Sequence, residues 1–161
     1  MSASLSKGDL SKKGWAHYQV LREREVIVFS DYSKISGKGL FVGEEVKVGQ
    51  LVVEFTGDRL SKKQAYMRKD KRYLITLRRV AIDGINSGVT RYINHSCDAN
   101  AHFRIIKLEG DEDKEVVFVY AKRDLKLGEE VTVEYSWPHV DGLPYEKCRC
   151  GNEDCQKYIG M

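Results

Sequence analysis

The sequence predicts a single, mostly β domain with few short helices. Its 161 residues are the usual size of one domain that buries a core of its own. Apolar, β-branched and aromatic residues come in short runs separated by glycines, which is typical of strands joined by turns. No apolar run approaches the ~18 residues of a membrane span. The first residues carry no hydrophobic signal segment, so we expect neither membrane insertion nor signal-directed secretion.

Seven apolar runs are expected to form strands. They are Val26–Phe29, Leu40–Val42, Leu51–Phe55, Tyr73–Leu77, Phe103–Ile106, Val116–Tyr120 and Val131–Tyr135. Glycines between the runs supply the turns. The polar stretch Asp111–Lys114 is expected to form the tip of a hairpin between the fifth and sixth runs.

Only Ser61–Lys71 has the character of a helix. Ser61 is a suitable N-cap residue, and Gln64 stands at the position of a capping-box partner. The first twenty residues are polar and mixed, with Trp15 and Tyr18 as their only large apolar anchors. No helix is therefore predicted at the N-terminus.

The charge is nearly balanced, because 27 basic and 24 acidic residues leave a net charge of +3. This excess is too small for electrostatically driven wrapping of DNA. A local basic run is broken only by Asp70, and consists of Lys62, Lys63, Arg68, Lys69, Lys71, Arg72, Arg78 and Arg79. We interpret residues 62–79 first as a solvated helix face with an adjoining strand, and alternatively as a contact for nucleosomal DNA.

Four cysteines form the strongest local pattern. Cys148, Cys150 and Cys155 make a Cys-x-Cys-x4-Cys turn, and Cys97 lies about fifty residues upstream. A disulfide between Cys148 and Cys150 would be strained, whereas such a turn readily supplies three thiolates to zinc. Cys97 is either the fourth ligand or an ordinary buried thiol. Four sulfur ligands would make a closed, structural zinc site.

The central segment Arg91–Cys97 is unusually polar for its surroundings. Asn94 and His95 together suit the polar edge of a purine. His95 alone is by default a satisfied core histidine, with a general base and a zinc ligand as the alternatives. Gly37-Lys38-Gly39, at the start of a strand, permits close approach of a ligand to the backbone. Tyr135 ends the last predicted strand.

These motifs, in this order, resemble a SET-domain protein lysine methyltransferase followed by a post-SET zinc segment. The resemblance runs from about Val26 to Ile159 and divides the chain into an N-terminal flank (1–24), a catalytic domain (25–138) and a zinc segment (139–161). The fold it implies is β-clip-like, a set of small curved sheets. In that fold the Asn-His-Ser-Cys segment threads beneath a loop, in a knot-like arrangement, to meet the strand of Tyr135.

The resemblance implies S-adenosylmethionine as cofactor and a structural zinc ion. The residues that it implies for the cofactor are Ser36, Gly37, Lys38, Gly39, Leu40, Tyr73, Arg91, Asn94, His95, Arg149 and Tyr158. Those that it implies for zinc are Cys97, Cys148, Cys150 and Cys155. Tyr135 corresponds to the catalytic tyrosine, and Phe103 and Phe55 are the aromatic residues expected at the lysine. Phe55 stands where many relatives carry tyrosine, so one hydroxyl is missing.

The activity implied is methyl transfer to a lysine amine by in-line displacement. Well under ~1% of a lysine with a pKa near 10.4 is neutral at pH 7, but desolvation beside a sulfonium favours the neutral amine. A histone tail is the expected substrate, and a nuclear, chromatin location follows from it. The alternatives are a non-histone protein substrate, or a catalytically degenerate SET domain that binds a peptide or nucleic acid. A cytoplasmic enzyme or an effector delivered into a host cell is the alternative location.

Overall fold

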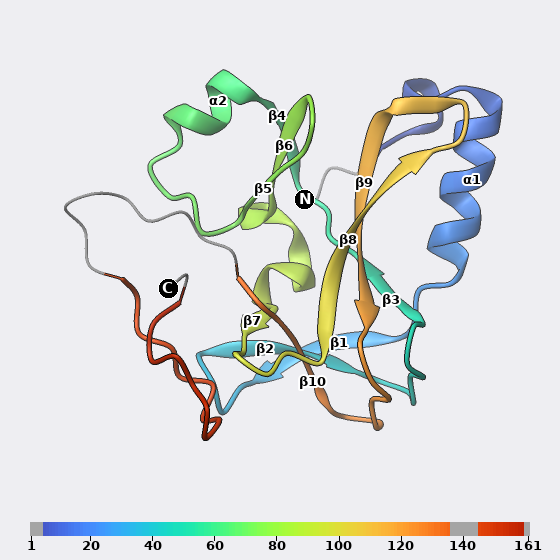
Figure 1. The fold of residues 1–161 in the computed structure, drawn as a ribbon. Helices are drawn as coiled ribbons and strands as arrows, with labels where there is room; N and C mark the ends of the chain where they lie inside the picture. The colour runs from blue at the N-terminus through green and yellow to red at the C-terminus, as the bar shows by residue number, and fades with distance from the viewer. Residues whose placement is uncertain (1–4, 136–144, 160–161) are drawn as a thin grey trace.

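The computed structural model describes residues 5–135 and 145–159, and within them the chain forms small sheets rather than one large one (Figure 1). The boundary expected between residues 138 and 139 lies outside the described residues. The described strands are β1 (Val28–Tyr32), β2 (Lys38–Val42), β3 (Leu51–Glu54), β4 (Asp58–Ser61), β5 (Leu74–Thr76), β6 (Val80–Asp83), β7 (Asn94–His95), β8 (Ala101–Leu108), β9 (Asp111–Ala121) and β10 (Glu130–Val133). The helices are η1 (Lys7–Asp9), α1 (Lys12–Glu23), α2 (Lys62–Met67), η2 (Gly84–Asn86) and η3 (Gly88–Tyr92).

The strands form three sheets with the orders β1-β2-β10-β7, β3-β9-β8 and β4-β6-β5. Strands β7 and β10 run parallel, with Asn94 opposite Thr132 and His95 opposite Val133. The expectation that the Asn-His-Ser-Cys segment meets the strand before Tyr135 is therefore confirmed. This pairing, between residues almost forty positions apart, brings the polar central segment beside Tyr135.

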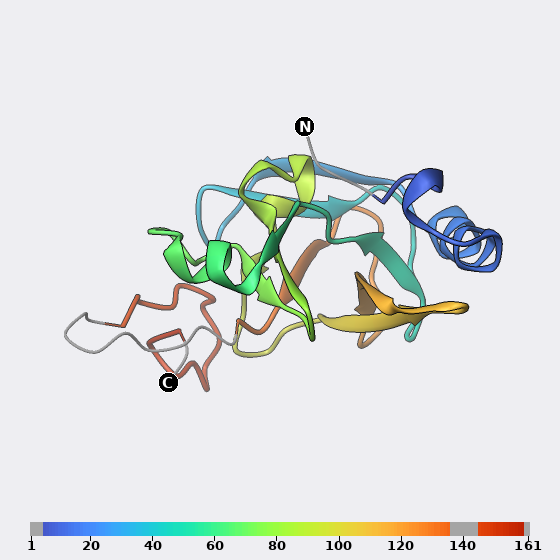
Figure 2. The same cartoon turned by 90° about the horizontal axis from the view of Figure 1, so that it is seen from above.

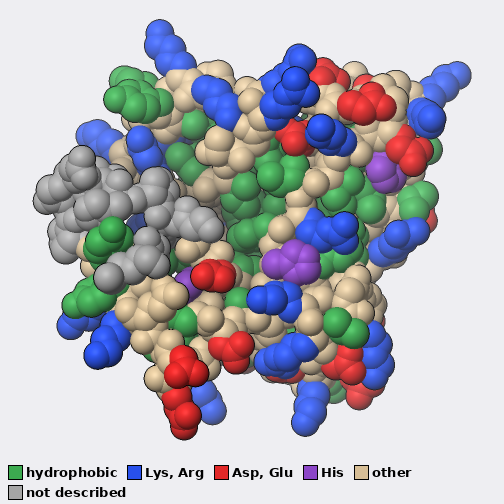
Figure 3. Space-filling view, viewed as in Figure 1, with side chains coloured by type: hydrophobic (Ala, Val, Ile, Leu, Met, Phe, Trp, Pro, Cys, Tyr) green, Lys and Arg blue, Asp and Glu red, His purple; other side chains and the backbone are tan. Residues whose placement is uncertain are grey.

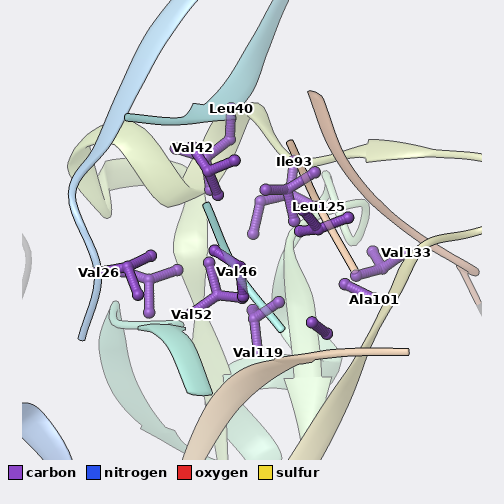
Figure 4. Packing of buried hydrophobic residues seen from close by; sticks show 13 residues of the cluster. Val26, Leu40, Val42, Val46, Val52, Ile93, Ala101, Val119, Leu125 and Val133 are labelled. Carbon is purple, nitrogen blue, oxygen red and sulfur yellow. The ribbon is translucent and has the colours of Figure 1, made fainter. Parts of the chain in front are cut away.

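The main core lies where the first two sheets face each other, and it consists largely of β-branched residues (Figure 4). Leu40 and Val42 of β2 and Val131 and Val133 of β10 are all fully buried in it. Because successive side chains of a strand point to opposite faces, Glu130, which precedes Val131, points away from this core. The Glu130 carboxylate instead contacts Ser33 and Asn94 in the site described below.

Helix α2 confirms the predicted start of a helix. Ser61 accepts a hydrogen bond from the backbone N–H of Gln64, and the Gln64 side chain accepts one from the N–H of Ser61. The helix is shorter than predicted, because Arg68 adopts an extended backbone conformation instead of continuing it. The Arg68 side chain turns instead toward Asp83, 3.4 Å away.

The prediction that the N-terminal region contains no helix was wrong, because α1 spans Lys12–Glu23. Tyr18 and Leu21 are buried on one face of it, against a second, smaller core. Ser11 caps its start, and the Asp111 carboxylate accepts hydrogen bonds from the Ser11 N–H and hydroxyl at 2.9 and 2.6 Å. Few apolar residues repeat along α1, so its helical character comes from tertiary packing rather than from a visible period.

The strand predictions hold for each of the seven runs, with shifted bounds, but the hairpin tip was misplaced. Strand β9 already begins at Asp111, and the turn is made by Glu109 and Gly110. Gly110 has a positive φ of 79°, which suits the turn, while Asp111 is held by Ser11. Strands β4, β6 and β7 were not predicted, since they are short and partly polar.

Two views place α1 and the cysteine-rich segment 145–159 at opposite ends of the molecule (Figures 1 and 2). Helix α2 lies at the same end as segment 145–159. Among the described residues, no helix is long and apolar enough to cross a membrane.

Candidate functional site

A polar clamp fixes the loop between β1 and β2. The Ser33 hydroxyl donates to the Glu130 carboxylate at 2.8 Å, and the Asn94 side-chain amide donates to the same carboxylate at 2.9 Å. The same amide lies 3.1 Å from the carbonyl oxygens of Ser36 and Lys38. A Cβ added at Gly39 would overlap the Glu130 carboxylate, which explains why a glycine is needed there. Asn94 therefore fixes the backbone of the loop between β1 and β2 through the carbonyl groups of Ser36 and Lys38.

A cavity of about 330 Å³ lies in front of this loop. Eight of the eleven residues predicted to bind the cofactor line it, namely Ser36, Gly37, Lys38, Tyr73, Arg91, Asn94, His95 and Arg149. Glu146 and Lys147, from the cysteine-rich segment, contribute the opposite wall. The residues before β2, the central segment and the cysteine-rich segment thus form one cavity, although they are far apart in the sequence.

A second cavity, of about 550 Å³, lies between α2, β5 and β8. Phe55 and Phe103 line it, with their ring centroids 5.4 Å apart in an edge-to-face arrangement. Figure 3 shows apolar side chains gathered in a hollow between α2 and β8, with Lys and Arg side chains along the α2 edge. Its floor is aromatic and its rim is polar, which suits a long side chain with a charged end.

The two cavities share four lining residues, Arg72, Tyr73, Arg91 and Tyr135. The Tyr135 hydroxyl donates to the Ile93 carbonyl, which fixes its direction. Burial raises the pKa of Tyr135, so the hydroxyl stays neutral at physiological pH and is no phenolate base. A molecule in one cavity can therefore touch a molecule in the other beside a fixed, neutral hydroxyl.

Arg91 has one buried polar atom without a partner. Its guanidinium lies over the rings of Tyr73 and Tyr92, at 5.8 and 5.4 Å from their centroids. Its Nε is the only buried side-chain nitrogen or oxygen that lacks a hydrogen bond within residues 5–135 and 145–159. An unpaired buried donor is costly, so its position in both cavities fits a ligand that brings an acceptor such as a carboxylate.

The four cysteines come together at the edge of the smaller cavity. Their sulfur atoms all lie within 4.8 Å of one another, and Cys97 Sγ is 3.7 Å from Cys148 Sγ and 3.9 Å from Cys155 Sγ. Four sulfurs at 2.3 Å from a tetrahedral zinc ion would be about 3.8 Å apart. Burial raises the pKa of Cys97 and of Cys148, so a cation is needed to ionise these two thiols. The donor set fits a structural zinc ion, with Cys97 as fourth ligand.

His95 lies between the cysteines and Tyr135. It is only 6% exposed, and its Nδ1 accepts a hydrogen bond from the Tyr135 backbone N–H at 2.9 Å. Its Nε2 is 3.5 Å from Cys97 Sγ. Burial lowers the pKa of His95, which favours the neutral ring. Of the roles left open by the sequence, the geometry argues against a general base, because both ring nitrogens are already engaged.

Three predicted cofactor residues do not contribute side chains to the cavity. Leu40 is fully buried in the main core, and Gly39 packs against Glu130. Tyr158 is 37% exposed and pairs through its backbone with Lys147. Sequence reasoning missed Ser33 and Glu130, because nothing local to either residue marks the hydrogen bond that joins them.

Four of the eight basic side chains between residues 62 and 79 make contacts within the protein. Lys62 donates to the Leu77 carbonyl, Arg68 faces Asp83, and Arg72 forms a bidentate pair with Asp70. The Lys71 ammonium lies 4.9 Å from the centroid of the Tyr66 ring. Lys62, Lys71 and Arg72 also line the larger cavity, so three of the eight residues of the run border the candidate site.

Comparison with known proteins identifies the class of this fold and site. The sequence profile of the SET domain matches residues 37–136, and the chain therefore belongs to the SET domain family. The protein called histone-lysine N-methyltransferase ASHH2 of Arabidopsis thaliana is 31% identical to it, over 88% of this chain and 8% of that protein. An H3 lysine-4 specific histone-lysine N-methyltransferase of Schizosaccharomyces pombe is 30% identical, over 99% of this chain and 18% of that protein.

Other matches agree with that class. A probable histone-lysine N-methyltransferase, set-23 of Caenorhabditis elegans, is 26% identical over 86% of this chain and 62% of that protein. A solved structure, described as ctPRC2 in an autoinhibited conformation bound to S-adenosylmethionine, superimposes with a TM-score of 0.59. Its identity is 27%, over 68% of this chain and 15% of that chain. The chain thus spans less than a fifth of the first two curated relatives.

Proposed function

We propose that the protein is an S-adenosylmethionine-dependent protein lysine N-methyltransferase that acts on a histone. The observation that carries the proposal is the meeting of two cavities at Tyr73, Arg91 and Tyr135. One cavity has polar walls of loop backbone, amide and guanidinium groups, and the other has an aromatic floor. The curated relatives are named histone-lysine N-methyltransferases, which supports both the reaction and the substrate class.

The smaller cavity is the proposed cofactor site. The polar clamp presents the backbone of residues 36–38, Arg91 offers its unpartnered Nε to a carboxylate, and Arg149 supplies a charge from the cysteine-rich segment. S-adenosylmethionine, when bound, supplies a methyl group on a positively charged sulfur. Three predicted cofactor residues do not line this cavity, and we propose that they support it indirectly: Gly39, Leu40 and Tyr158.

The larger cavity is the proposed lysine site. Phe55 and Phe103 remove water from the side chain, and desolvation shifts a lysine toward its neutral, nucleophilic form. Tyr135, held by the Ile93 carbonyl, keeps an oxygen that can accept a hydrogen bond and orient the amine. No base is assigned among the described residues, and alignment supplies most of the rate enhancement.

Replacing Tyr135 by phenylalanine is expected to lower kcat for methyl transfer by roughly 10- to 100-fold, since one orienting hydrogen bond to the amine is lost. The thermal midpoint of unfolding should fall only slightly, because one hydrogen bond to the Ile93 carbonyl is worth about 1 kcal/mol. The assay measures transfer of labelled methyl groups to core histones. If the parent protein transfers methyl groups neither to histones nor to proteins of a proteome extract, the result favours the alternative of a degenerate, peptide-binding SET domain.

We also propose that the enzyme adds more than one methyl group. Neither Phe55 nor Phe103 has a hydroxyl that could hold a water molecule or hinder rotation of a methylated amine. Phe103→Tyr is therefore expected to reduce the ratio of di- and trimethylated to monomethylated product several-fold in mass spectra. Phe103 is the residue to change, because a Cβ at Gly84 would overlap the tip of the Phe55 ring and a hydroxyl there would be crowded. A parent enzyme that stops at one methyl group under excess enzyme contradicts the proposal.

Two further parts of the proposal rest on the same reaction. A histone substrate implies a nuclear, chromatin location, and the catalytic domain is proposed to end near residue 138. Contact between the basic run 62–79 and nucleosomal DNA remains a prediction, because several of its charges already have partners in the protein. If it forms, nucleosome binding should weaken steeply as salt is raised.

A further inference from the structure

The His95 ring joins the four-cysteine cluster directly to the backbone at Tyr135. One ring nitrogen, Nδ1, accepts from the Tyr135 N–H at 2.9 Å, and the other, Nε2, lies 3.5 Å from Cys97 Sγ. The ring is almost completely shielded from water, so both interactions form in a low-dielectric environment.

The two contacts fix which nitrogen carries the proton. A neutral imidazole has one donor and one acceptor nitrogen. Because Nδ1 accepts from a backbone N–H, the hydrogen must be on Nε2, where it points at the Cys97 sulfur. A metal-bound thiolate is a good acceptor for such a donor, and groups of this kind orient metal ligands.

The surrounding backbone makes the connection stiff. His95 pairs with Val133 in the parallel β7–β10 ladder, and the Ser96 N–H donates to the Val133 carbonyl at 3.1 Å. From the other side, the Asn152 amide donates to the Ser96 hydroxyl at 2.9 Å and lies 3.3 Å from Cys150 Sγ. The cysteine cluster and β10 are thus tied to the same two residues of the central segment.

We propose that His95 is a positioning residue that transmits the state of the metal site to Tyr135. Its Nε2–H orients the Cys97 thiolate toward the metal, and its Nδ1 holds the Tyr135 backbone where the two cavities meet. The effect on catalysis rests on the proposed function, whereas the effect on the metal does not. Both nitrogens are used, so the ring itself is not a ligand for the cofactor or a base for lysine.

The test separates the two nitrogens. His95→Asn keeps an acceptor near the position of Nδ1 and loses the donor to Cys97, while His95→Gln keeps a donor near the position of Nε2 and loses the acceptor for Tyr135. His95→Phe keeps a ring and loses both. The control His102→Phe removes an imidazole that stacks on Tyr120, away from both cavities. Zinc affinity is measured by competition with a chromophoric chelator, and kcat and KM are measured at saturating zinc.

We expect His95→Asn to weaken zinc binding about 10- to 100-fold, since partners of metal ligands have effects of that size, and to lower kcat less than His95→Gln does. His95→Gln should retain most of the zinc affinity and lose kcat with little change in KM for the cofactor. His95→Phe should lose both, and His102→Phe neither. Equal losses in all three His95 variants, or zinc affinity and kcat within twofold of the parent in His95→Phe, overturn the proposal.

The zinc measurement keeps this test separate from the proposed function. A parent protein that transfers no methyl group to any substrate refutes the proposed function. The weaker zinc binding of His95→Asn and His95→Phe, with the normal value for His102→Phe, still supports the contact with Cys97. In that case the Tyr135 amide resonance reports the other contact, and it should shift on zinc addition in the parent but not in His95→Phe.

Discussion

Removal of zinc is expected to abolish methyl transfer while the β core stays folded. Segment 145–159 has no helix and no strand, only an isolated bridge between Lys147 and Tyr158, and Ile159 is its one buried residue among those described. Such a segment cannot bury enough apolar surface to order itself. Zinc binding by small peptides is worth about 10–16 kcal/mol at pH 7, and that free energy supplies the order.

The loss of activity follows from the position of this segment. Glu146, Lys147 and Arg149 form a wall of the smaller cavity, and they are held by Cys148 and Cys150 on either side of Arg149. When the wall is lost, the cofactor site is open to solvent on one side. Activity of the chelated protein should fall below about 1% of the parent value, the scale of losses seen when a metal site is disrupted.

The measurement combines metal content, activity and circular dichroism. Cys155→Ser removes one ligand without changing the cavity lining, so it should reproduce the effect of the chelator, and added zinc should restore only the chelated parent. The main core consists of residues from the sheets, so the β signal and the cooperative melt should persist after chelation. A chelated protein that is free of zinc and still fully active would falsify the idea that the metal orders this wall.

An element of the fold can be predicted from the sequence when the interactions that form it lie within a few residues of one another. The strand runs and the start of α2 could be predicted, because alternating burial and a capping box act within a few residues. Helix α1 could not, since its polar sequence hides a narrow face that carries Tyr18 and Leu21. Strand β7 has only two residues and exists because β10 lies beside it, which no local pattern reveals.

The same distinction between local and long-range interactions decides which residues of the candidate site could be predicted. Three cysteines could be identified from their spacing, but Cys97 and the loop around Gly37 became part of one site only through resemblance to a family. The clamp between Ser33, Asn94 and Glu130 joins residues up to 97 positions apart, and nothing local in the sequence marks Ser33 or Glu130 as partners of Asn94. The burial of the Glu54 carboxyl was not predicted, because its hydrogen-bond partner Tyr18 is 36 positions away in the sequence.

The second large effect concerns Glu54: its burial is expected to lower the free energy of unfolding as the pH rises. It is 6% exposed at the end of β3, and its carboxyl accepts hydrogen bonds from the Tyr18 hydroxyl at 2.9 and 2.7 Å. Burial raises the pKa of Glu54 from 4.5 to about 7, although the Tyr18 hydrogen bond and the charge of Arg22, 3.9 Å away, act in the opposite direction. Desolvation is therefore stronger than both favourable contacts.

The direction of the pH effect follows from the number of protons bound. Between pH 4.5 and about 7 the folded protein keeps a proton on Glu54 that the unfolded chain has released. The free energy of unfolding therefore falls as the pH rises through this interval. At pH 8 the ionised Glu54 carboxyl therefore lowers the free energy of unfolding by roughly 3 kcal/mol, at about 1.36 kcal/mol per unit of pKa difference between the folded and unfolded states.

Glu54→Gln should remove this cost, because the amide carries no charge and its oxygen still accepts from the Tyr18 hydroxyl. Denaturant unfolding of parent and variant is compared at pH 4.5 and pH 8. We expect a gain of roughly 3 kcal/mol for the variant at pH 8 and a much smaller difference at pH 4.5. Glu23→Gln, on the exposed face of α1, removes the same charge and so measures the effect of net charge alone. An equal gain at both pH values would show that packing, rather than the buried charge, sets the cost of Glu54.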